Sequence, residues 1–210
     1  MKFRIIFSLF LLTHISSYGQ YDWKYGELVL KNNDTIKGFI QIPMISRGTL
    51  TNSKKIKFKE NLEGKITRYD HTSANKLIFK DLNNENSLFE YIRTSPSKVQ
   101  LFKRIYTGNK IRLYARMVSD VSHSHPDANG FVQKTVWRPS DFNEYYAQRK
   151  YERNATALIK VMGPFVFQKS FSKNAMKYFA DCPDLVAKLK NRTLKESDLL
   201  SIIQEYDECE

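Results

Sequence analysis

The chain has 210 residues, of which 41% are hydrophobic and 13% aromatic, and its formal net charge is +12. This composition can supply a packed core and argues against intrinsic disorder as the default state. The positive charge favours anionic partners, such as lipid headgroups, lipopolysaccharide or acidic glycans, although a basic surface also serves solubility alone.

The first nineteen residues have the three parts of a secretory signal peptide. Lys2 and Arg4 form the basic start, residues 5–12 form the apolar core, and Ser17 and Gly19 are the small residues before a predicted cut after Gly19. The alternative is a buried N-terminal helix or strand. The apolar core is shorter than the ~20 residues of a transmembrane helix, and no later segment could span a bilayer. We therefore expect a secreted or periplasmic protein with no transmembrane segment in the mature chain, and no nucleic-acid partner.

Residues from about 25 to 160 have the two-residue alternation of β-strands. For example, Ile56 and Phe58 alternate with lysines in "KKIKFKE". The predicted strands lie in the segments 27–31, 35–42, 54–60, 65–70, 75–81, 87–93, 99–119, 131–137, 144–151 and 156–161. Turn signals separate them, including "NND" after the first strand and "TGNK" at 107–110. Short strands with frequent turns predict an antiparallel meander or a partly closed barrel rather than βαβ units.

The periodicity becomes helical after residue 168. Ser172 is placed to cap a first helix, and Pro183 and Asp184 suit the first turn of a second. "TLKE", residues 193–196, is a capping-box pattern before a third helix whose apolar positions are Leu199, Ile202, Ile203 and Tyr206. About 35 helical residues are too few to be stable alone, so we expect them to dock on the sheet.

These elements predict an α+β fold with three parts. They are a signal peptide (1–19), a β-rich body (20–168) and a helical C-terminal segment docked on the body (169–210).

Both ends of the mature chain resemble one family. The segments "GELVLKNNDTIKGFI" and "YFADCPDLVAKL…EYDEC" are similar to those of a family of secreted proteins of unknown function from Gram-negative bacteria. The resemblance implies an envelope location and a β-then-α layout, and it brings no activity.

The sharpest candidate for catalysis is "HSHPD". His123, His125 and Asp127 would share one face of a strand and could hold Zn²⁺ with a position left for water. The serines, the proline and the "ANG" that follows are instead typical of a polar connecting loop, which is the reading we prefer. Nucleophile-elbow and phosphate-binding motifs are absent. We therefore predict no catalytic or cofactor-binding residues and no cofactor, with a metal-dependent hydrolase as the alternative.

A basic and aromatic mixture lies on the strand after "TGNK". Arg112, Tyr114 and Arg116 would share one face of a regular strand. Arginine binds carboxylate or phosphate, and tyrosine stacks on sugars, so these three residues are a candidate anion- or glycan-binding face. The competing interpretation is the solvated side of a half-buried sheet.

The chain has only two cysteines, Cys182 and Cys209. They would lie at the same end of an antiparallel helical hairpin, and an even pair in an oxidising compartment favours a disulfide. A thiol-redox role for Cys182 near a helix N-terminus is the alternative. Taken together, the sequence predicts a non-enzymatic envelope protein that binds an anionic envelope component or another envelope protein, or acts structurally.

Overall fold

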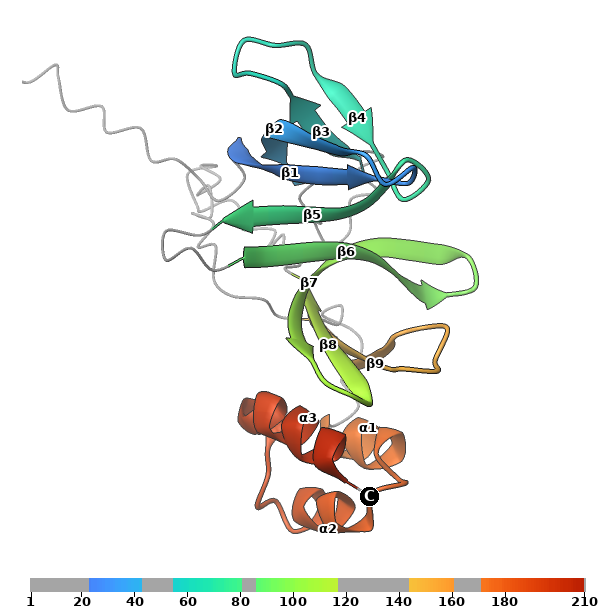
Figure 1. The fold of residues 1–210 in the computed structure, drawn as a ribbon. Helices are drawn as coiled ribbons and strands as arrows, with labels where there is room; N and C mark the ends of the chain where they lie inside the picture. The colour runs from blue at the N-terminus through green and yellow to red at the C-terminus, as the bar shows by residue number, and fades with distance from the viewer. Residues whose placement is uncertain (1–22, 43–54, 81–85, 117–143, 161–170, 210) are drawn as a thin grey trace, which may run out of the picture.

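A computed structural model describes residues 23–42, 55–80, 86–116, 144–160 and 171–209. Its ten strands form one open antiparallel sheet, followed by three short helices (Figure 1). The strands are β1 (Lys24–Leu30), β2 (Thr35–Gln41), β3 (Ile56–Lys59), β4 (Thr67–Tyr69), β5 (Ala74–Lys80), β6 (Asn86–Ser95), β7 (Lys98–Thr107), β8 (Ile111–Arg116), β9 (Glu144–Arg149) and β10 (Thr156–Ile159). The helices are α1 (Phe171–Tyr178), α2 (Pro183–Lys190) and α3 (Leu199–Glu208), with a 3₁₀ turn at Glu196–Asp198.

The predicted antiparallel α+β fold is confirmed, and of its two predicted forms the sheet takes the open one. The predicted strand at 131–137 and the signal peptide lie outside the described residues. None of the described helices has the length and apolar character needed to cross a membrane.

The sheet consists of two meanders joined side by side. Its strand order is β10-β9-β8-β7-β6-β5-β1-β2-β3-β4, so β1 pairs with both β2 and β5. Only residues 70–73 connect β4 to β5 and span at most about 18 Å. A flat sheet would place these two strands about 19 Å apart sideways, and further apart along the strand direction. The sheet must therefore roll up over β1–β5, as Figure 1 shows.

The turn and the glycine of the N-terminal motif make this roll possible. Asn33 has a positive φ of 70°, and the Leu30 amide donates to the Asp34 carbonyl at 2.8 Å. A Cβ on Gly38 would lie 2.3 Å from the Lys59 carbonyl oxygen and 2.8 Å from the Phe58 ring. Only glycine allows β2 to approach β3 this closely.

Apolar side chains cover both faces of the sheet. One cluster fills the roll and includes Leu28, Ile40, Ile56, Leu77 and Phe79. A second joins β8–β10 to the three helices, so the helices lie at the opposite end of the sheet from the roll (Figure 1). A third, built on Phe102 of β7, Tyr114 of β8 and Tyr146 of β9, lies on the other face of the sheet.

Two predicted helix caps are wrong in detail. Ser172 lies within α1, which begins at Phe171, so it is not the residue before the helix. Its hydroxyl donates to the Leu189 carbonyl at 3.2 Å. Before α3, the carboxylate of Asp198, not of Glu196, accepts from a backbone amide, that of Lys195, at 2.9 Å. A 3₁₀ turn precedes α3 and shifts the helix start to Leu199.

Candidate functional site

The two cysteines form a disulfide, as predicted. Cys182 directly precedes α2 and Cys209 directly follows α3, and their Cα atoms are 6.1 Å apart. Such a bond is compatible with an extracellular or periplasmic location.

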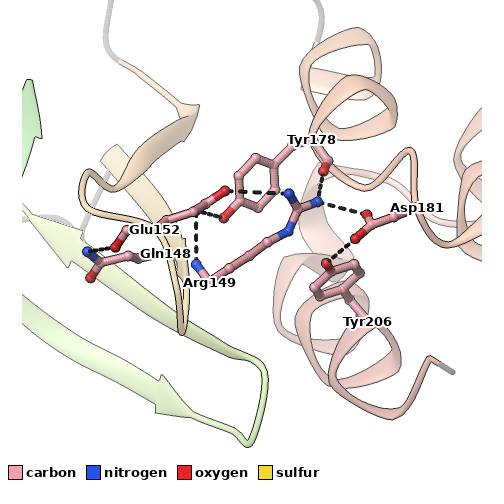
Figure 2. A network of polar contacts seen from close by, with 6 residues as sticks. All are labelled: Gln148, Arg149, Glu152, Tyr178, Asp181 and Tyr206. Atoms are coloured by element: carbon pink, nitrogen blue, oxygen red, sulfur yellow. Dashed lines mark hydrogen bonds and ion pairs between the residues drawn. The ribbon is translucent and has the colours of Figure 1, made fainter.

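Arg149, the last residue of β9, joins the sheet to the helices (Figure 2). Its guanidinium donates to the Asp181 carboxylate at 2.7 Å and to the Tyr178 carbonyl, and it lies 3.5 Å from the Glu152 carboxylate. The same guanidinium lies over the rings of Tyr178 and Tyr206, at 4.6 and 5.3 Å from their centroids. One cation thus contacts α1, α3 and the segment between α1 and α2.

Tyr178 and Tyr206 donate hydrogen bonds to the other carboxylate oxygens of this cluster. Tyr178 donates its hydroxyl to Glu152 at 2.6 Å, and Tyr206 donates to Asp181 at 2.7 Å. Burial, together with the hydrogen bond to Asp181, raises the pKa of Tyr206 to about 12. Every carboxylate in Figure 2 accepts from a protein donor, and these contacts connect the helices to the end of β9.

Asp207 on α3 makes a second connection at the same end of the sheet. Its carboxylate accepts from the backbone amides of Asn109, Lys110 and Ile111 at 2.9, 2.7 and 3.3 Å, and from the Tyr106 hydroxyl at 3.3 Å. Burial opposes ionisation of this carboxylate, but the amide hydrogen bonds outweigh it and lower the pKa of Asp207. The helix therefore holds the β7–β8 turn in place.

The predicted face on β8 is regular but mostly buried. Arg112, Tyr114 and Arg116 alternate with the helix-facing residues Ile111 and Leu113, as expected. Arg112 is exposed, whereas Tyr114 is 1% and Arg116 8% exposed. Of the three, only Arg112 is available to a ligand from solvent.

Arg116 instead forms a buried ion pair with Glu144, which is 2% exposed. Its Nε donates to a Glu144 carboxylate oxygen at 2.6 Å, and a second guanidinium nitrogen lies 2.5 Å from the same oxygen. The guanidinium lies 5.2 Å from the Phe102 ring centroid and 5.7 Å from that of Tyr146. Arg116 therefore belongs to the core in this structure.

A shallow concavity of about 330 Å³ lies on the same face, over β5–β7. Its lining includes Lys76, Ile78, Asn86, Leu88, Arg104 and Ile105. Lys76 is half-buried and has no ion-pair partner among the residues that the structure describes. Arg104 lies 3.5 Å from the Glu90 carboxylate, and Glu90 accepts no hydrogen bond at that oxygen.

Arg112 adjoins this concavity. It lies opposite Thr107, a lining residue, in the β7–β8 register. The cations Lys76, Arg104 and Arg112 therefore lie on one face of the sheet, with Glu90 as the acidic residue among them. We refer to the concavity and these four charged residues as the cationic concavity.

The predicted metal motif, His123, His125 and Asp127, lies outside the described residues. Within the described ranges, no group of three or more histidine, cysteine, aspartate or glutamate residues could hold a metal ion.

Sequence reasoning missed Arg149, Asp207 and Lys76. A signal for Arg149 was present, since alternation in "EYYAQR" puts it on the same face as Ala147, and a charge on a buried face needs a partner. Asp207 and Lys76 gave no such signal, because their roles depend on segments about 100 and 30 residues away in the chain.

Comparison of the chain with protein-family models, with curated proteins and with solved structures found no match.

Proposed function

We propose that the protein is a secreted or periplasmic envelope protein that binds an anionic envelope component, without catalysis, through the cationic concavity. The observation that carries this proposal is that Lys76 lacks an ionic partner in the part of the chain that the structure describes. This half-buried lysine has no ionic partner among the described residues, beside an arginine that is only loosely paired. Partial burial removes some of the water around a cation, so a lysine without a partner at a concave surface favours an anion from outside the chain.

The compartment supports the same proposal. The disulfide suits an oxidising compartment, and the predicted signal peptide and the family resemblance both indicate the cell envelope. Phosphate and carboxylate groups are abundant on envelope lipids and glycans, so a basic face meets suitable ligands there.

Retention of the purified protein on dextran sulfate beads, at rising salt, tests the proposal. We expect Lys76→Gln combined with Arg104→Gln to elute at clearly lower salt than wild type, since direct charge contacts are screened by salt. The matched control is Lys150→Gln combined with Arg153→Gln, which removes the same charge from exposed positions in the β9–β10 turn. Equal shifts in the two double variants would mean that net charge alone causes retention, and the proposal would be wrong.

The alternative, a metal-dependent hydrolase that uses His123, His125 and Asp127, predicts a different result. Metal analysis of the purified protein would then find stoichiometric zinc that is lost in His123→Ala. Binding through the cationic concavity predicts that retention on dextran sulfate is unchanged in this variant.

A further inference from the structure

We infer that the cationic concavity binds an anionic amphiphile, that is, a phosphate or carboxylate headgroup carrying an alkyl chain. This inference rests on the proposed function and narrows it to one class of ligand. It depends on what lies between the cations.

Aliphatic side chains from three neighbouring strands line the concavity. Ile78 and Leu88 are direct cross-strand partners, and Ile105 comes from the irregular pairing between β7 and β8. Ile105 is 37% exposed, which is high for such a side chain. An alkyl chain lying on these three side chains would remove apolar surface from water on both partners, at about 25 cal/mol per Å².

The charges lie beside this apolar surface. Lys76 is two residues from Ile78 on β5, and Arg104 directly precedes Ile105 on β7. Glu90 holds Arg104 through a single contact of 3.5 Å, which leaves its other guanidinium nitrogens available to an oxyanion. Cations next to an aliphatic surface match a ligand with a charged head and an apolar tail.

The lining disfavours sugars and nucleic acids. Both classes are usually bound by aromatic rings that stack on the ligand. The aromatic residue of the lining is Tyr106, and its hydroxyl donates to Asp207 on α3. Its cross-strand partner on β8 is Leu113, which faces the helices. The Tyr106 ring therefore lies on the helix side of the sheet.

The size of the concavity sets a further limit. A volume of about 330 Å³ is at the lower end of ligand sites, which span roughly 300–1,000 Å³. It suits one headgroup with the first part of a chain.

Calorimetry with three probes tests the inference on the full chain. The probes are dihexanoyl phosphatidic acid as a monomer, glycerol 3-phosphate, which has a phosphate without chains, and dihexanoyl phosphatidylcholine, which has the chains with a zwitterionic head. We expect phosphatidic acid to bind at least tenfold more tightly than either of the others. We also expect Ile105→Ser to weaken this binding severalfold while retention on dextran sulfate stays unchanged.

The outcomes separate the two proposals. Equal binding of glycerol 3-phosphate and phosphatidic acid would overturn the amphiphile proposal and leave anion binding intact. Equal binding of phosphatidylcholine and phosphatidic acid would show that the site does not recognise the negative charge of the headgroup. If phosphatidic acid is not bound while dextran sulfate retention depends on Lys76 and Arg104, the ligand is a soluble polyanion. If neither retention on dextran sulfate nor binding of phosphatidic acid depends on these two residues, both proposals are wrong. Because Ile105 is exposed, Ile105→Ser is expected to fold, and circular dichroism checks this.

Discussion

The helix junction and the cationic concavity use charge in opposite ways. At the junction, Arg149 and Asp207 are surrounded by partners from other segments. In the concavity, Lys76 has no ionic partner among the described residues, and Arg104 has one contact of 3.5 Å. We therefore expect the junction to stabilise the fold, and we propose that the concavity serves a ligand. Substitutions at the two places should therefore affect different properties, with the larger losses of stability at the helix junction.

The disulfide should contribute most. Replacement of both cysteines, Cys182→Ser with Cys209→Ser, opens a loop whose ends are 27 residues apart. We expect the free energy of unfolding to fall by about 3.5 kcal/mol on the chain-entropy model. Urea unfolding followed by circular dichroism measures this change. An unchanged midpoint would show that the helices are held by the junction alone.

Arg149→Met should have the next largest effect. It removes the contacts to Asp181, Glu152 and the Tyr178 carbonyl, but keeps most of the apolar stem. The site is partly solvated, and Met also removes a buried Nε–H that has no hydrogen-bond partner. We therefore expect a loss of about 2 kcal/mol, less than for a fully buried ion pair. The control is Lys150→Met, an exposed neighbour that should change stability by less than about 0.5 kcal/mol.

Asp207→Asn should cost about 1 kcal/mol, because a neutral amide is a weaker acceptor for the three backbone amides of the β7–β8 turn. The effect should depend on pH with a defined sign. The pKa of Asp207 is lower in the folded chain, so its stabilisation is fully present above the unfolded value of about 3.9 and is lost as pH falls through the folded pKa. Unfolding curves of both proteins should thus differ at pH 6 and converge toward pH 2.

Gly108→Ala offers an independent route to the same contact. A Cβ at Gly108 would lie 2.3 Å from the Asp207 carboxyl group and force it away. The losses from Gly108→Ala and Asp207→Asn should therefore not add in the double variant. Full additivity would show that Asp207 does not hold this turn.

The smallest stability effect is expected in the cationic concavity. Lys76→Gln and Arg104→Gln should each change the free energy of unfolding by less than about 0.5 kcal/mol, because neither side chain has a strong partner to lose. A loss as large as that of Arg149→Met would erase the contrast between the two regions. Thermal unfolding of each variant measures it.

Local patterns in the sequence were sufficient for most strands, the helix faces and the disulfide. Alternation placed Ile56 and Phe58 inward, and helical phasing brought Cys182 and Cys209 to one end. The pairing of β1 with β5 was not predictable, because it joins segments that are far apart in the chain and depends on the roll of the sheet.

The candidate site was harder to predict. Alternation correctly put Arg112, Tyr114 and Arg116 on one face, but it does not say whether that face is covered. Burial of Arg116 depends on Glu144, which is 28 residues away. The cationic concavity brings together β5, β6 and β7, and no local motif records that combination.

The two ends of the sheet have a consequence for self-association. An open sheet presents unpaired backbone amides and carbonyls along its edge strands, which can template pairing with another chain. In the described sheet these strands are β4, with three residues, and β10, with four. Edges this short offer few backbone groups to a second copy, and Arg68 adds a charge to the middle of β4. The sheet can therefore remain open while its edges resist aggregation.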